Sequence, residues 1–218
     1  MALAEHTKQA RVAVILDAAE RLIRADAGTQ FSMRALALEA GVSQATPFNL
    51  LGSKAKILEA LLLRSFALPQ AEPEAFNPAE HNALDYAFDF CELVAQRYGA
   101  DEAYYRALMS GLGAAFDSLL AGIANWQLVL TVALHQGDLR PDTPIASLAE
   151  TIELGIAGTM GFWASGDLAS ERLLPQWHFA IAGVCCVFAT DSAQPRLQEI
   201  LRSAARKLQV LGTLVSVG

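Results

Sequence analysis

The sequence has few cysteines, little charge for its length and no long apolar run. Of its 218 residues three are cysteines and 18% are charged, whereas 53% are apolar. No stretch approaches the roughly 18 uninterrupted apolar residues that indicate a membrane-spanning helix, and the most apolar stretches, 119–134 and 181–190, favour buried helices. The N-terminal residues MALAEHTKQARVAV lack the apolar core and cleavage-like site of a secretory signal. We therefore expect a cytoplasmic protein.

The sequence also lacks the usual signatures of enzymes and metal sites. The cysteines are odd in number, lack metal-ligand spacing and favour buried thiols in a reducing compartment: Cys91, Cys185 and Cys186. The histidines are scattered and form no His-x-x-x-His pair: His6, His81, His135 and His178. Neither a Gly-x-Ser-x-Gly motif nor a phosphate-binding or dinucleotide-binding glycine loop occurs. The sequence thus predicts no catalytic site, no metal and no cofactor.

Charge is distributed unevenly along the chain. The net charge is −7, which taken alone argues against a nucleic-acid partner. Residues 1–66, however, hold eight basic and six acidic side chains, so the remainder holds eight basic and seventeen acidic ones. Residues 67–80, ALPQAEPEAFNPAE, contain three prolines and no apolar period. We therefore expect a mildly basic domain at 1–66, a connection, and an acidic domain within 67–218.

Helical periodicity predicts an all-α fold. Residues 9–27 carry an apolar stripe on one helical face, and no alternating pattern persists long enough for a strand. Gly28 is placed to end this first helix in a left-handed conformation. Ser32 is a candidate N-cap for Met33–Ala40, Gly41 supplies a turn, and Ser53 caps another leucine-rich helix. Further helices are expected near 81–99, 101–114, 116–136, 145–165, 170–190 and 194–211.

Pro47 interrupts the short helix that follows Gly41. A proline in a helix interior costs about 3 kcal/mol, so the register of this helix matters. If Ser43 is the N-cap, Pro47 is the fifth residue and only the first helical hydrogen bond is lost. Thr46 is the alternative cap, with Pro47 at the favoured first position. The earlier start, with a distorted first turn, is our prediction.

Two short helices joined through a small-residue turn have the dimensions of a helix-turn-helix. The run FSMRALALEAGVSQATPFNLLGSKAKILEALL resembles the N-terminal module of the TetR family of transcriptional regulators, which has a Ser or Thr cap, a helix, AGVS, a short recognition helix, then SK and a leucine-rich helix. The resemblance covers about residues 11–66. It implies an all-α homodimer that binds palindromic operator DNA, most often as a repressor, and responds to a small ligand in the C-terminal domain.

The resemblance also implies a set of DNA-binding residues. Ser32, Met33 and Arg34 would lie at a phosphate, where free N–H groups at a helix start suit an anion. The residues that would face base edges lie on the recognition helix and at its start: Ser43, Gln44, Ala45, Thr46, Phe48 and Asn49. Lys54 would hold a backbone phosphate without reading sequence.

The recognition helix departs from the family in two ways. Phe48 stands where a tyrosine is common, so a hydroxyl contact to phosphate is lost while packing in the core can survive. The helix also contains no Lys or Arg, so basic contacts must come from Arg34, Lys54, Lys56 and Arg11. Three alternatives therefore stay open: a purely structural helical hairpin, a helical small-molecule-binding protein that has lost DNA binding, and an all-α enzyme.

The C-terminal two-thirds is rich in aromatic residues that suit either a core or a ligand cavity between helices. The resemblance implies a cavity among the middle helices, and the predicted lining is Phe88, Tyr104, Tyr105, Phe116, Trp126 and Phe162. Gly155, Gly158 and Gly161 recur every three residues in one helix, which favours close packing of another helix there. The segment GTMGFWASGD resembles the family's dimer-forming region. We expect a homodimer through 145–165 and 170–190, with a tight internal contact as the alternative.

Overall fold

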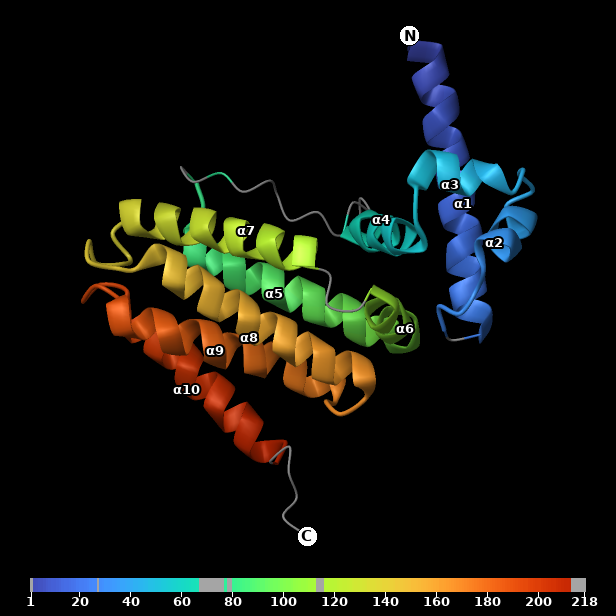
Figure 1. Cartoon of the computed structure of the whole chain (residues 1–218). Helices are drawn as coiled ribbons and strands as arrows, with labels where there is room; N and C mark the ends of the chain where they lie inside the picture. The colour runs from blue at the N-terminus through green and yellow to red at the C-terminus, as the bar shows by residue number, and fades with distance from the viewer. Residues whose placement is uncertain (1, 27, 67–76, 78–79, 113–115, 213–218) are drawn as a thin grey trace. The chain divides into compact units, whose positions relative to one another are not determined.

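The structure, a computed structural model, describes residues 2–26, 28–66, 77, 80–112 and 116–212. Within these ranges every regular element is a helix, and an isolated antiparallel bridge joins Leu139 and Ala189. The elements are α1 (Ala2–Asp26), α2 (Met33–Glu39), α3 (Ala45–Leu51), α4 (Lys54–Phe66), α5 (Ala83–Ala100), α6 (Glu102–Leu112), α7 (Phe116–His135), α8 (Ile145–Ser165), a 3-10 turn η1 (Ser170–Arg172), α9 (Leu173–Phe188) and α10 (Gln194–Val210). The all-α prediction is confirmed (Figure 1).

The chain forms two compact units. The first comprises Met1–Glu72 and Asp101–Gly113, and therefore contains α1–α4 and α6; the second comprises Pro73–Ala100 and Ala114–Gly218, with α5 and α7–α10. The sixth helix thus packs with the N-terminal helices rather than with its sequence neighbours. The expected connection at 67–80 lies largely outside the described residues, so the boundary near residue 66 stays a prediction.

The first unit is built around the apolar stripe of α1. The side chains of Ile15, Leu16 and Ile23 are buried, as the helical period predicted. Each neighbouring helix adds apolar groups to the same core: Leu36 and Ala37 from α2, Ile57, Leu58 and Leu61 from α4, Tyr104, Tyr105 and Leu108 from α6. Burial of these side chains fixes α2, α3 and α4 against α1 and so sets the direction in which α3 points outward.

Local chain chemistry sets the helix ends in this unit. The Ser32 hydroxyl oxygen accepts a hydrogen bond from the Ala35 N–H (3.1 Å), and Ser53 does the same for Lys56 (3.2 Å); both N-cap predictions are confirmed. Gly41 has φ 65°, as its turn requires. The prediction for Gly28 is wrong: its φ is not positive, and its N–H instead donates to the Ile23 carbonyl (3.3 Å), which closes the helix end.

In the second unit α8 lies between α7 and α9, and α10 packs on α9 (Figure 1). Trp163 of α8 is fully buried, stacks on Tyr98 at 5.3 Å and donates from its indole nitrogen to the Ser170 hydroxyl (2.8 Å). At the opposite end of α8, Arg196 of α10 bridges Asp85 (2.8 Å) and Asp138 (3.0 Å). These contacts hold the helices of this unit in one register.

The end of α8 and the cysteines are further features of the second unit. Gly166 ends α8 at φ 91°, in the left-handed conformation. Cys91 and Cys185 are buried as expected, and burial raises the pKa of each thiol to about 12, whereas Cys186 is only half-buried, against the expectation. No helix among the described residues is both long and apolar enough to span a membrane.

Candidate nucleic-acid interface and ligand cavity

Helices α2 and α3 form the helix-turn-helix that the sequence predicted. The Gly41 N–H donates to the Leu38 carbonyl (3.1 Å) and the Val42 N–H to the Ala37 carbonyl (3.0 Å), so the chain reverses tightly after α2. Helix α3 then begins at Ala45, and its end at Gly52 has φ 82°. Helix α3 packs on α1, α2 and α4, with Pro47 buried and Gln44, Ala45, Phe48 and Asn49 exposed on its other side. Its other face is free to meet a partner.

The observed start of α3 lies between the two that the sequence left open. Gln44 occupies the N-cap position without a side-chain cap bond, and the Thr46 N–H donates to the Ser43 carbonyl (2.9 Å). Pro47 is therefore the third helical residue, where a backbone N–H has no partner within a helix. The predicted start with Ser43 as cap is wrong by one residue, because the turn closes at Thr46. Pro47 loses no helical bond, and its buried ring packs into the core.

The outward face of α3 carries four of the predicted contact residues. Gln44, Ala45 and Asn49 are exposed, and Phe48 exposes 64% of its surface. The expectation that Phe48 retains a place in the core is wrong, because Pro47 occupies the inward position of that turn. An exposed phenyl ring gives α3 an apolar contact surface between two amide side chains. Amides pair with adenine edges and apolar groups touch thymine methyls.

The remaining predicted contacts lie at the helix starts. Ser43 and Thr46 bond each other through their hydroxyls (2.7 Å), and Ser32 is engaged in its cap. Met33 is half-buried at the first position of α2, and Arg34 beside it is exposed. Lys54 begins α4 with its ammonium 4.7 Å from the centroid of the Phe31 ring, which holds this charge near the start of the helix.

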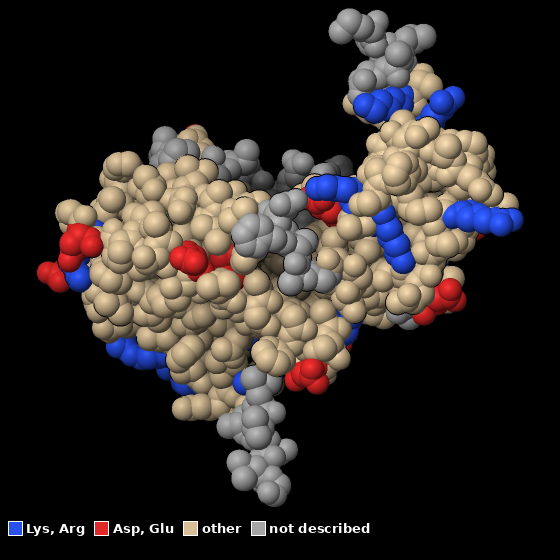
Figure 2. All heavy atoms as spheres, viewed as in Figure 1, with Lys and Arg blue, Asp and Glu red and all other residues tan. Residues whose placement is uncertain are grey.

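Most other basic side chains of this unit are neutralised by carboxylates. Arg21 pairs with Glu39 (2.6 Å), Arg64 with Asp17 and Glu20 (both 2.5 Å), and Lys56 with Glu59 (2.7 Å). Arg24 pairs with Glu20 and Asp101 and lies over the Tyr104 ring. In the part of the chain that the structure describes, Arg11, Arg34 and Lys54 form no ion pair with a carboxylate. Figure 2 shows Lys and Arg side chains dispersed over the visible face of this unit rather than gathered in one patch.

The second unit contains a cavity of about 420 Å³ between α5, α7, α8 and α9. Its wall is mostly apolar and aromatic: Tyr86, Ala87, Phe90, Cys91, Val94, Gly122, Asn125, Trp126, Leu128, Val129, Glu153, Ile156 and Trp177. A volume of this size suits a small organic molecule. The cavity thus has the concave, apolar character of a ligand site.

Glu153 is the one acidic residue among the described residues of this wall. Its carboxylate accepts a hydrogen bond from the Trp126 side chain, and burial raises its pKa while that bond opposes the rise. Gly122 of α7 faces the carboxylate so closely that a Cβ there would stand 2.2 Å from the Glu153 Cδ. The absence of a side chain at 122 therefore provides the niche that Glu153 occupies.

The structure brings one of the six predicted lining residues to this cavity, Trp126. Phe88 is buried against His178 instead, with ring centroids 5.1 Å apart. Tyr104 and Tyr105 lie in the core of the first unit, and Phe162 exposes 61% of its surface on α8. The side chain of Phe116 lies outside the described residues. Sequence reasoning missed Glu153, whose signal, an acidic residue in the apolar helix IASLAETIELGIAG, is shared with Glu150.

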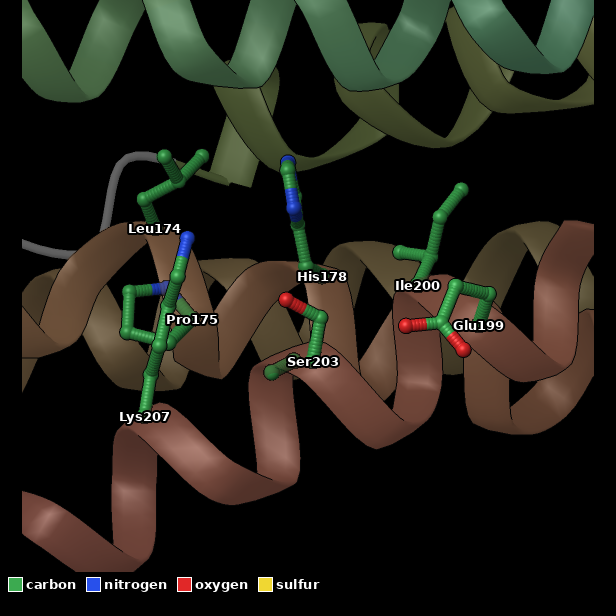
Figure 3. A pocket seen from close by; sticks show the side chains of 8 residues that line it. Leu174, Pro175, His178, Glu199, Ile200, Ser203 and Lys207 are labelled. Atoms are coloured by element: carbon green, nitrogen blue, oxygen red, sulfur yellow. The ribbon is translucent and has the colours of Figure 1, made fainter.

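A second, smaller hollow of about 270 Å³ lies between α9 and α10. Charged and hydroxyl groups contribute to its wall, among them Glu199, Ser203 and Lys207. Figure 3 shows the imidazole of His178 pointing away from Ser203 and Glu199; a hydrogen bond joins it to the backbone of Phe88 on α5, and burial lowers its pKa. Among the described residues no group of three or more His, Cys, Asp or Glu could hold a metal ion.

The faces of α8 and α9 that were expected to form a dimer carry exposed apolar side chains. Leu154 and Phe162 on α8 expose 52% and 61% of their surfaces, and Val187 on α9 exposes 62%. A Cβ at Gly158 or Gly161 would meet no described atom within 4 Å. Tight internal packing therefore does not explain these two glycines.

Comparison with known proteins finds a family match within the first unit. Residues 15–61 match the family model of the bacterial regulatory proteins, tetR family. The match covers α2, α3, the C-terminal half of α1 and most of α4, the helices that carry the interface described above. No match is found among the curated proteins.

Solved structures of regulators share the fold of the whole chain. TylP, a TetR regulator from Streptomyces fradiae, is 17% identical with a TM-score of 0.60, over 92% of this chain and 94% of that one. CprB from Streptomyces coelicolor, in complex with its operator sequence, is 18% identical with a TM-score of 0.55, over 93% and 98%. A gamma-butyrolactone receptor (ArpA-like protein) is 14% identical with a TM-score of 0.54, over 93% and 100%.

Proposed function

We propose that this chain, a member of the tetR family by its N-terminal segment and its fold, is a ligand-responsive transcriptional regulator. It binds palindromic operator DNA as a homodimer and acts as a repressor that a small apolar or aromatic molecule releases. Residues 1–66, together with α6, are the DNA-binding domain, and the remainder of 67–218 binds ligand and dimerises. The observation that carries this proposal is the outward face of α3, where Gln44, Phe48 and Asn49 are exposed.

The side chains of α3 recognise the base sequence of the DNA. Gln44 and Asn49 each offer a donor and an acceptor that match the major-groove edge of adenine, and Ala45 and Phe48 offer apolar contacts to thymine methyls. Thr46 is half-buried and bonded to Ser43, so both hydroxyls shape the start of α3 and lie beside the DNA. This combination favours A·T base pairs in each half-site.

Position on the duplex is set by phosphate contacts from the flanking helices. Arg34 in the first turn of α2 and Lys54 at the start of α4 are cations without a carboxylate partner among the described residues. Ser32 and Met33 place the start of α2 at the backbone, where main-chain N–H groups add to the attraction for phosphate. The operator-bound state of CprB, which has a similar fold, supports this mode of binding.

The cavity between α5, α7, α8 and α9 is the proposed effector site, and α6 is the proposed link to DNA. Helix α5 ends at Ala100 and α6 begins at Glu102, so the chain connects a wall of the cavity directly to a helix of the first unit. Within that unit Arg24 of α1 bonds Asp101 (2.5 Å) at the start of α6. A ligand that shifts α5 therefore shifts α6 and the helices packed on it. Such coupling between sites is typically worth about 1–3 kcal/mol.

Dimerisation is proposed through the exposed faces of α8 and α9. Gly158 and Gly161 leave room for the close approach of a second helix, and Phe162 and Val187 add apolar surface. A dimer places two copies of α3 about one DNA turn apart, roughly 34–36 Å, which is the spacing that a palindromic operator requires.

Selection from a random pool of duplex DNA by the purified chain tests this function. We expect enrichment of an inverted repeat with A·T-rich half-sites whose centres lie about 10 base pairs apart. The matched comparison is the chain with both Arg34→Ala and Lys54→Ala. Equal enrichment with the wild type and this variant, or no enriched sequence, contradicts the proposal.

The second candidate is a helical small-molecule-binding protein that does not bind DNA. It is favoured by the composition of α3, ATPFNLL, which contains no Lys or Arg. The same selection separates the two functions, because this candidate predicts ligand binding in the cavity together with no enriched DNA.

A further inference from the structure

The wall of the cavity combines an acidic group with several aromatic rings. Tyr86 and Phe90 of α5, Trp126 of α7 and Trp177 of α9 contribute rings, and Glu153 of α8 contributes a carboxyl group. No Lys, Arg or His belongs to the described lining. The carboxyl group therefore faces an apolar space without a cation to balance it.

Neighbouring residues hold the side chain of Glu153 in place. The Trp126 side chain bonds the carboxylate, and Gly122 leaves the niche that the carboxyl group fills. Cys91 also lines the wall, and its thiol lies close enough for the Glu153 charge to add to the rise of the Cys91 pKa. These contacts keep a negative charge at the cavity at a cost, because burial without a cation disfavours the charged form.

We infer that the cavity takes an organic cation, with Glu153 as its counter-ion and the surrounding aromatic rings as its walls. A ligand ammonium supplies the missing positive charge, and aromatic faces attract cations most strongly where water is excluded. An apolar body attached to the ammonium fills the remainder of the cavity. This inference rests on the proposed role of the cavity as the effector site, and it narrows the effector from any apolar molecule to a lipophilic cation.

A matched pair of probes tests the inference on the full-length chain. Benzyltrimethylammonium and its neutral carbon isostere, neopentylbenzene, have the same shape and differ in charge. Equilibrium dialysis measures the dissociation constant of each. We expect the cation to bind at least about tenfold more tightly than the isostere at pH 7.5 and low salt. Equal or tighter binding of the isostere overturns the inference, and so does the absence of binding by both probes.

Variants assign the preference to Glu153. Glu153→Gln keeps the size and the hydrogen-bond acceptor, so we expect it to bind the neutral isostere as the wild type does and to lose the preference for the cation. The control is Glu150→Gln, which removes the same charge from an exposed position on α8 and keeps the preference. Gly122→Ala provides a second variant, because its methyl group displaces the carboxyl group and weakens cation binding. A preference that survives in both Glu153→Gln and Gly122→Ala contradicts the inference.

Failure of this inference and failure of the proposed function are read separately. A DNA titration of the same preparation, without probe, reports the regulator function. If the chain binds DNA but shows no preference for the cation, the cation inference is wrong and the proposed regulator function is kept. If the chain prefers the cation but binds no DNA, the cation inference is kept and the second candidate function is favoured.

Discussion

Gly111 and Gly122 each leave space that a neighbouring group occupies. A Cβ at Gly111 would stand 2.5 Å from the Thr29 hydroxyl oxygen and 2.9 Å from a Leu58 methyl carbon. Thr29 and Leu58 are buried, so neither side chain has room to withdraw. Gly111 lies in the last turn of α6. In the structure it allows α6 to pack closely within the first unit.

We expect Gly111→Ala to destabilise the chain by about 1–3 kcal/mol, the usual cost of forcing a methyl group against closely packed side chains. The control is Gly99→Ala in α5, where a Cβ meets no described atom within 4 Å and alanine favours the helix. Urea denaturation followed by circular dichroism measures both variants. Equal midpoints for Gly111→Ala and the wild type contradict the close approach of α6.

The raised pKa of Glu153 makes the stability of the chain depend on pH. Burial raises the pKa of its carboxyl group above the ordinary 4.5, so the folded chain binds a proton at pH values where the unfolded chain has lost it. The free energy of unfolding then falls as pH rises from about the ordinary pKa through the raised one. Glu153→Gln has no proton to lose, so its stability relative to the wild type rises over this window. If the difference in the free energy of unfolding between Glu153→Gln and the wild type does not change with pH, the raised pKa of Glu153 is contradicted.

At the scale of elements, α3 shows how a proline fits a short recognition helix. Pro47 lies third in the helix, where its missing N–H costs no bond, and its buried ring packs toward the core. Its fixed φ also restricts the unfolded chain. The proline therefore stabilises α3 and directs Phe48 outward.

Replacement of Pro47 tests this register directly. Pro47→Ala removes ring packing and frees the unfolded chain, so we expect a loss of about 1 kcal/mol in the free energy of unfolding. A proline within the hydrogen-bonded part of a helix would instead cost about 3 kcal/mol, and its replacement would stabilise the chain. The sign of the change in a urea titration distinguishes the two registers.

The sequence predicts elements more reliably than the groups that meet between them. The caps at Ser32 and Ser53 depend on residues within one turn of the chain, and both are found as expected. The exposure of Phe48 depends on the phase of a seven-residue helix, so a shift of one residue in its start reversed the expectation. The cavity wall depends on how four helices pack, which no local pattern encodes. Trp126 was foreseen as lining, whereas Glu153 could not be told from Glu150 in the same helix.

At the scale of the whole molecule, the proposed function depends on dimerisation and on the attraction between basic side chains and DNA phosphates. Leu154, Gly158 and Phe162 are exposed on α8, and Figure 2 shows a largely uncharged surface over the visible helices of the second unit. Apolar patches of this kind commonly mark protein interfaces. The proposed dimer covers this face and pairs the two DNA-reading helices.

Phe162→Glu tests the dimer. A charge in the centre of an apolar interface without a partner is strongly unfavourable, so we expect this variant to sediment as a monomer where the wild type sediments as a dimer. Leu120→Glu is the control, because Leu120 is 50% exposed on α7 and lies outside the proposed interface. A monomeric wild type, or a dimeric Phe162→Glu, contradicts the assignment of this face.

The salt dependence of DNA binding tests the central claim most directly. Arg34 and Lys54 give a dimer four phosphate contacts, which predicts a slope of about −3.6 for the logarithm of the association constant against that of salt concentration. Lys54→Ala removes two contacts and reduces the slope by about 1.8, whereas Arg106→Gln, which removes a cation paired with Glu102 at 2.6 Å, leaves it unchanged. A flat slope for the wild type, or an unchanged slope for Lys54→Ala, contradicts the account.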